Sequence, residues 1–90
     1  MTKKIIKTSG ACGAFGVCRE TLRTRAKEGL YPQPLPGGGY LQSEVDAVID
    51  ALAAGWDDGK VRQLVAALMA ERQTVAADLL RYLQPAGALL

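Results

Sequence analysis

Basic side chains are concentrated in the first half of the chain, and their chemistry is the binding of anions. Residues 1–40 carry seven Lys or Arg against two Glu, a net charge of +5, whereas residues 41–90 carry four against seven Asp or Glu, a net charge of −3. Arg19, Arg23 and Lys27 recur at intervals of four, which aligns them along one side of a helix. This segregation favours a surface that faces phosphate, and an ordinary solvated helix face is the simpler alternative.

The residue types that catalysis and metal binding require are scarce. The sequence has no His, and its two cysteines, Cys12 and Cys18, cannot fill a tetrahedral zinc shell alone. We expect both to be packed, reduced thiols. The run Gly37–Gly39 lacks the spacing of a nucleotide-phosphate loop and does not directly precede a helix. We therefore expect no enzyme, no cofactor and no metal site.

The length and composition are those of one small domain with a helical extension. The chain has 90 residues, of which 49% are hydrophobic and 22% charged. No apolar run approaches the roughly 20 residues that span a bilayer, and the basic N-terminus is not followed by an apolar signal segment. The expected compartment is the cytoplasm.

Two short helices are expected to position the basic residues. Thr8 or Ser9 can cap the first, which runs to about Phe15, after an extended arm whose two isoleucines dock on the core. Gly16 then supplies the left-handed backbone position of a tight turn.

The basic segment itself is predicted to be helical from Arg19 to Glu28. Leu22 and Ala26 form its buried stripe, and Gly29 ends it.

A β-hairpin is predicted after this helix. Prolines at 32, 34 and 36 preclude a helix and a central strand but suit an edge strand. The three glycines would form the tip, and Tyr40-Leu41 the return strand.

Two further helices are expected. Ser43 opens one with a capping box in which Asp46 is the N3 acid, and Gly55 ends it. The helical pattern resumes from about Lys60 to Leu83. The order of elements predicts a mainly α fold: a winged helix-turn-helix with a short β-hairpin wing over residues 1–55, then a helical extension over residues 56–90. Such an order points to a polyanionic duplex as partner. The extension would pack on its own domain or mediate self-association through residues 60–83.

The span from Ile5 to Leu52 resembles the AlpA-like and excisionase-type small DNA-binding proteins of phages and integrative elements, which belong to the MerR-like winged helix-turn-helix group. The residues that carry the resemblance are Gly16-Val17, Arg19-x-Thr21-Leu22, Lys27-Glu28-Gly29, Pro32-x-Pro34, Gly37 to Leu41 and Ser43-Glu44-Val45.

The resemblance implies a double-stranded DNA partner, with the helix 19–28 in the major groove. Arg19 or Arg23 would contact a guanine, Glu20 would accept from cytosine or orient its neighbours, and Thr24 would touch phosphate or a thymine methyl. Phosphate contacts are expected from Lys3, Lys4, Lys7, Arg25 and Lys27, and the wing would contribute Gln33, Gly38 and Tyr40.

Three positions depart from the family pattern. Cys18 stands where a capping Ser is common, and a thiol is a poorer acceptor. Arg25 stands where a core residue such as leucine is usual, and it could pair with Glu28 or Glu44. The wing tip is glycine instead of basic.

The resemblance implies a transcriptional regulator or an excisionase, that is, a recombination directionality factor, with an integrase or RNA polymerase as a further partner. One alternative is a phage DNA-packaging protein similar to the small terminase subunit. The other is a protein-binding adaptor whose basic helix faces an acidic partner. No membrane association is expected.

Overall fold

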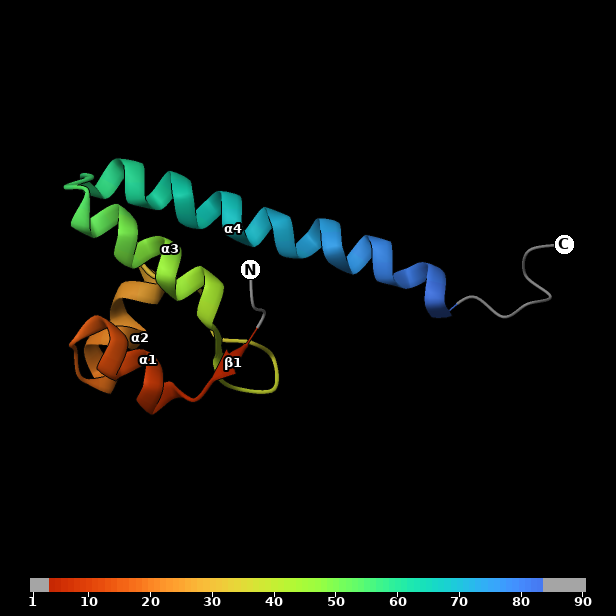
Figure 1. The fold of residues 1–90 in the computed structure, drawn as a ribbon, viewed down its shortest axis with the longest axis horizontal. Coiled ribbons are helices and arrows are strands. Elements are labelled where there is room, and N and C mark those ends of the chain that lie inside the picture. The colour runs from red at the N-terminus through yellow and green to blue at the C-terminus, as the bar shows by residue number, and fades with distance from the viewer. Residues whose placement is uncertain (1–3, 84–90) are drawn as a thin grey trace, which may run out of the picture.

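The computed structural model describes residues 4–83. In order, these form β1 (Ile5–Ile6), α1 (Thr8–Phe15), α2 (Arg19–Lys27), β2 (Tyr40–Leu41), α3 (Gln42–Ala53), α4 (Asp58–Leu79) and a 3-10 helix, η1 (Leu80–Leu83). α1, α2 and α3 form a small body, and α4 runs along α3 and continues well past it, so the molecule measures 52 × 25 × 24 Å (Figure 1). The prediction of a mainly α fold with a small two-stranded sheet is confirmed.

The turn between α1 and α2 forms as predicted at Gly16. This residue has φ 70°, and the amide of Val17 donates to the carbonyl of Cys12 at 3.0 Å, which closes the end of α1. The predicted caps at the start of α1 are wrong: the helix begins at Thr8, and the N-cap residue Lys7 provides no side-chain hydrogen bond. The N-terminal amides of α1 therefore lack a side-chain cap.

The small sheet differs from the predicted hairpin. β2 pairs antiparallel with β1, in the register Ile5 with Leu41 and Ile6 with Tyr40, and no strand forms within residues 30–36. The proline-rich segment has too few amide donors for a ladder, so the N-terminal strand takes its place. Because alternate side chains of a strand point to opposite faces, Ile6 packs on the core whereas Ile5 is 64% exposed, contrary to its predicted docking.

The glycine tip turns tightly beneath β1. Leu35 donates to the carbonyl of Gly39 at 2.9 Å, and Gly38 donates to that of Leu35 at 2.8 Å. Gly39 has φ 84°, and a Cβ there would lie 2.8 Å from the carbonyl oxygen of Ile6. Only glycine fits this position, since any side chain would be strained and would collide with backbone.

The predicted capping box of α3 is not formed. The helix follows β2 directly and begins at Gln42, whose amide donates to the carbonyl of Lys4 at 2.7 Å. Ser43 therefore already lies inside the helix, and its N-cap residue Leu41 has no side-chain acceptor.

α4 is capped by Asp57, whose carboxylate accepts from the amide of Lys60 at 2.9 Å. Val61 and Val65 on its first half lie in the same buried cluster as residues of α1, α2 and α3. This half of α4 is therefore part of the core that supports α2. The members of the cluster are Ala11, Leu22, Ala26, Tyr31, Tyr40, Val45, Val48, Val61 and Val65.

Candidate nucleic-acid interface

α2 has a row of exposed cationic side chains, and its opposite side is buried in the core. Leu22 and Ala26 are 1% and 3% exposed and fix the helix to the core. Arg19, Arg23 and Lys27 are all exposed, at positions one turn apart. Glu20 and Thr24, the other side chains predicted to reach the bases, are exposed as well.

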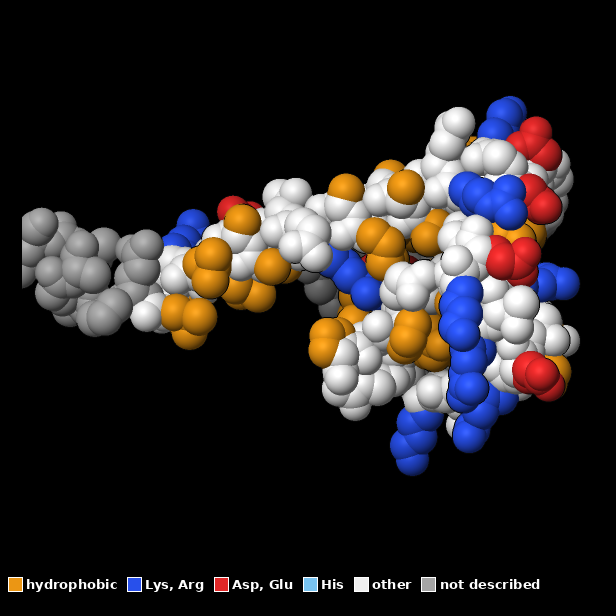
Figure 2. Space-filling model, turned by 180° about the vertical axis from the view of Figure 1, so that it is seen from behind, with side chains coloured by type: hydrophobic (Ala, Val, Ile, Leu, Met, Phe, Trp, Pro, Cys, Tyr) orange, Lys and Arg blue, Asp and Glu red, His pale blue; other side chains and the backbone are white. Residues whose placement is uncertain are grey.

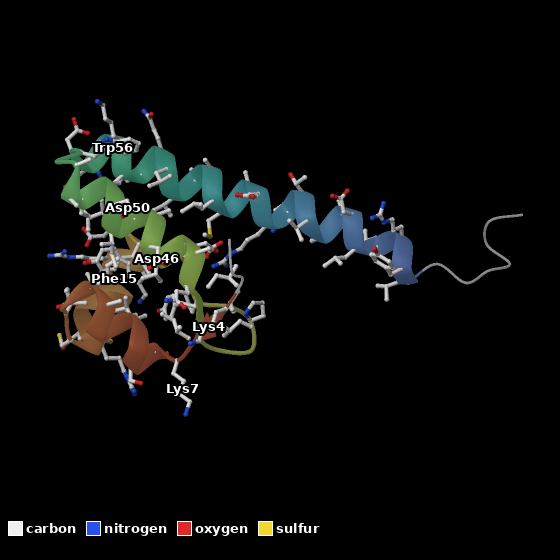
Figure 3. All side chains as sticks on the ribbon, viewed as in Figure 1. Lys4, Lys7, Phe15, Asp46, Asp50 and Trp56 are labelled. Atoms are coloured by element: carbon white, nitrogen blue, oxygen red, sulfur yellow. The ribbon has the colours of Figure 1, made fainter. Side chains whose placement is uncertain are left out.

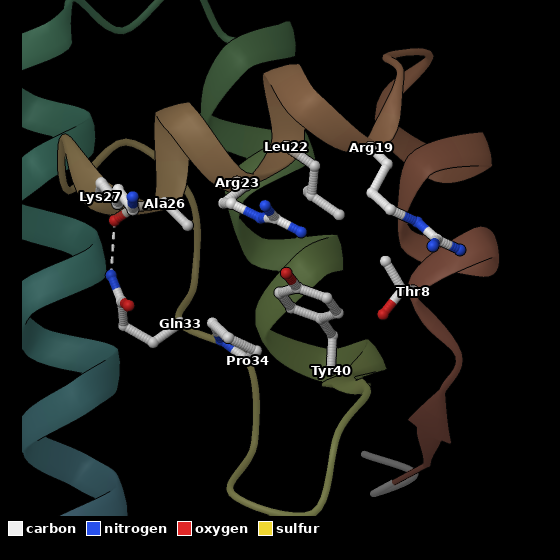
Figure 4. A pocket seen from close by; sticks show the side chains of 9 residues that line it. All are labelled: Thr8, Arg19, Leu22, Arg23, Ala26, Lys27, Gln33, Pro34 and Tyr40. Carbon is white, nitrogen blue, oxygen red and sulfur yellow. Dashed lines mark hydrogen bonds between the residues drawn. The ribbon is translucent and has the colours of Figure 1, made fainter.

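A concave surface lies beside this row. It is a cavity of about 410 Å³ between α2, the start of α1 and the segment that leads into β2 (Figure 4). Three of the residues that line it are cationic and none is acidic. The cavity brings together five of the predicted contact residues, Arg19, Arg23, Lys27, Gln33 and Tyr40, with Thr8, Leu22, Ala26 and Pro34.

Tyr40 forms part of the cavity floor. The residue is 4% exposed, and its hydroxyl points into the space near Arg23 (Figure 4). Burial raises the pKa of Tyr40, Cys12 raises it further, and Arg23 lowers it in part. The hydroxyl is therefore a protonated donor near neutral pH.

Gln33 already has an internal partner. Its side-chain amide donates to the carbonyl of Ala26 in the last turn of α2, which also accepts from the amide of Gly29 at 3.1 Å (Figure 4). The predicted wing residue thus holds the loop against α2. Gly38, also predicted to approach DNA, lies at the exposed turn with φ 93°, and a Cβ at this position would meet no atom within 4 Å.

Arg25 lies apart from the cavity. Its guanidinium donates to the hydroxyl of Tyr31 at 3.0 Å and sits 5.6 Å from the centre of that ring. Tyr31 is buried and stacks on Phe15 with ring centres 4.0 Å apart. The predicted pairing of Arg25 with Glu28 or Glu44 is therefore wrong, because Arg25 pairs with Tyr31 instead.

Two arginines of α4, which the sequence analysis did not single out, hold the end of α2 and the following loop. Arg62 donates to the carbonyl of Glu28 at 3.0 Å. Arg72 binds the buried carboxylate of Glu44 through two nitrogens, one of them at 2.7 Å, and also donates to the carbonyl of Gln33 at 2.8 Å. Arg72 follows Leu68 by four residues, so it lies on the side of α4 that packs against the core. A charged residue at such a position indicates a buried partner.

The N-terminal lysines extend the basic surface. Lys4 and Lys7 are exposed, and Lys7 points away from the body (Figure 3). Lys3 lies outside the described residues. Lys and Arg side chains form a column over one side of the body, whereas the projecting half of α4 carries several hydrophobic side chains among polar and charged ones (Figure 2).

Both cysteines are free thiols. Cys12 is half-buried, and Cys18 is the exposed N-cap residue of α2, where it provides no cap hydrogen bond. A hydrogen bond to Thr21, with 3.2 Å between sulfur and oxygen, lowers the pKa of the Cys18 thiol.

No protein-family model, curated protein or solved structure matches the chain. None of the helices in residues 4–83 is long and apolar enough to cross a membrane. In the same range, no group of three or more His, Cys, Asp or Glu could hold a metal ion.

Proposed function

We propose that the chain is a sequence-specific double-stranded DNA-binding protein that inserts α2 into the major groove. The observation that carries the proposal is the row of exposed cations on a helix whose opposite side is buried, next to a cavity with no acidic wall. α2 carries four Lys or Arg and one Glu, a net charge of +3, so it suits a polyanion.

The contacts divide into two kinds. Arg19 and Arg23 have the fork of donors that recognises a guanine edge, and Glu20 and Thr24 are exposed beside them. Lys4, Lys7, Lys27 and Arg25 would bind phosphates and supply affinity that depends on salt. For Arg25 this role needs only its free nitrogens, because the bond to Tyr31 uses one.

The projecting end of α4 supports self-association. The side of α4 that packs on the body through Val61 and Val65 continues along the helix to Leu79, which is 53% exposed, and is followed by Leu83 at 76%. An apolar face that runs beyond its own domain favours a second copy. Two copies would present two α2 helices to repeated or inverted half-sites.

With the resemblance to excisionase-type proteins, these features support a regulator or excisionase of a phage or mobile element. The long projecting helix suits a DNA-packaging protein similar to the small terminase subunit equally well. Assembly beyond a dimer, measured by analytical ultracentrifugation with and without DNA, would favour this alternative. A protein-binding adaptor would instead show weak DNA association that is indifferent to salt.

The test selects a binding site from a random duplex library with the full chain and measures affinity for it over a salt series. Arg19→Ala or Arg23→Ala should weaken binding to the selected site by about 1–3 kcal/mol and relax its sequence preference. Arg81→Ala is the matched control, because it removes the same charge from the far end of the described residues, where the Arg81 guanidinium lies over the Tyr82 ring and donates to its hydroxyl. Failure to select any sequence, or equal losses in all three variants, would refute base reading by α2.

A further inference from the structure

We propose that the cavity beside α2 is a seat for one phosphate group, held by the Tyr40 hydroxyl, the start of α1 at Thr8 and whichever of the Arg19 and Arg23 guanidiniums does not contact a base. The site deepens the proposed function if the phosphate belongs to the DNA backbone, and free inorganic phosphate has the same chemistry. A DNA phosphate bound in this cavity would fix the distance between the DNA backbone and α2.

The first argument is the unpartnered hydroxyl of Tyr40. Within residues 4–83 it makes no hydrogen bond, although the residue is only 4% exposed. No side-chain oxygen or nitrogen in this range is both fully shielded and unpaired, so the hydroxyl reaches the open cavity. A buried ring that offers its hydroxyl only to a cavity is placed to donate to a ligand.

The second argument is the charge of the walls. Arg19, Arg23 and Lys27 line the cavity, and no carboxylate does. A cationic cavity with a neutral donor at its floor selects for an anion with several acceptor oxygens, as a phosphate has. A carboxylate would satisfy fewer of these donors.

The third argument is the start of α1. Thr8, its first residue, lines the cavity, and Lys7 before it contributes no side-chain cap. The first turn of α1 thus has no side-chain cap, and the positive end of the helix dipole lies at Thr8, which lines the cavity. α2 also begins at this cavity, with Arg19, after an N-cap residue that makes no cap hydrogen bond.

The volume fits this ligand. About 410 Å³ lies within the range of small-molecule sites and exceeds what a lone phosphate needs. Leu22, Ala26 and Pro34 also line the cavity; they are apolar and would contact the deoxyribose next to the phosphate. These apolar contacts favour a backbone phosphodiester over the free ion.

The first arm of the test titrates the full chain with sodium phosphate at constant ionic strength, followed by amide NMR, with sodium chloride as reference. Phosphate should produce saturable shifts at Thr8 and Ser9 that chloride does not. Tyr40→Phe should weaken this binding roughly tenfold, since it removes one hydrogen bond to a charged group and keeps the ring. Tyr31→Phe is the control, because it removes the hydroxyl of an equally buried tyrosine outside the cavity, one that accepts from Arg25, and this variant should bind phosphate as the parent does.

The second arm identifies the source of the phosphate. It uses the selected duplex with single methylphosphonate substitutions, which neutralise one phosphate at a time. One substitution should weaken binding by the parent chain about tenfold and weaken binding by Tyr40→Phe far less, because that variant has already lost the contact. Thr8→Val provides the same comparison if Tyr40→Phe does not fold.

Equal effects of phosphate and chloride, or unchanged phosphate and DNA affinity in both Tyr40→Phe and Thr8→Val, would overturn the phosphate seat. DNA reading by α2 would stand in that case if Arg23→Ala still weakened site binding. Conversely, saturable phosphate binding that needs Tyr40, without any DNA binding, would support the seat with free phosphate as its ligand and refute the DNA proposal.

Discussion

Replacing Arg72 with Met tests whether α4 supports the rest of the fold through a buried charge. The guanidinium binds both oxygens of Glu44 and the carbonyl of Gln33, and the two side chains are 20% and 6% exposed. Met keeps most of the volume but leaves the Glu44 carboxylate buried without its cation. Breaking a buried pair in this way costs about 3–5 kcal/mol, and the partial exposure of Arg72 places the expected loss near the lower end, about 3 kcal/mol.

Urea unfolding at neutral pH, followed by circular dichroism, measures this loss directly. At roughly 4–8 °C per kcal/mol for a domain of this size, the melting temperature should fall by about 12–24 °C. Glu44→Gln combined with Arg72→Met should recover part of the stability, because no unpaired charge is then buried. A loss below about 1 kcal/mol, or a double variant no more stable than Arg72→Met alone, would refute the idea that the pair is a structural support.

Three further predictions concern the turn, the projecting helix and a thiol. Gly39→Ala should destabilise the fold by about 2 kcal/mol or more in urea unfolding, because its φ is 84° and its Cβ would meet backbone; Gly37→Ala, with no atom within 4 Å, should change little. Leu79→Glu should shift any self-association seen by ultracentrifugation towards monomer and leave monomer stability unchanged, since the residue is 53% exposed. An unchanged mass would show that this face of α4 does not mediate the self-association. Cys18 should be alkylated faster than Cys12, because its lowered pKa increases the thiolate fraction, and its rate should rise at lower pH than that of an ordinary thiol. Thr21→Val should move this rise to higher pH. A pH profile that the substitution does not change would contradict the role of Thr21.

The elements that local pattern determines could be predicted from the sequence. Leu22 and Ala26 at helical spacing, with Gly29 after them, predict the start of α2 correctly and its end to within one residue. Gly16 likewise predicts the turn, because only a few residue types adopt a positive φ readily.

Features that depend on distant partners could not be predicted. β2 pairs with a strand more than 30 residues earlier, and nothing in residues 30–41 signals that partner. Glu44 and Arg72 are 28 positions apart, and nothing in the local sequence indicates that Glu44 pairs with Arg72 and not with the nearer Arg25. The sequence predicts five of the cavity's side chains as contacts, but they lie close to Thr8 only because α1 packs against α2.

The continuity of α4 makes it a rigid lever between the two ends of the molecule. It runs unbroken for 22 residues, about 33 Å at 1.5 Å per residue, and is clamped to the end of α2 by Arg62 and to the following loop by Arg72. If two copies join at the far end, the rotational phase between their α2 helices is set by the number of residues in this lever. One residue inserted after Gln73 would turn the distal end by about 100° relative to the body, whereas seven would return it to within about 20° of its original phase. The preferred half-site spacing on DNA would therefore vary periodically with the length of α4.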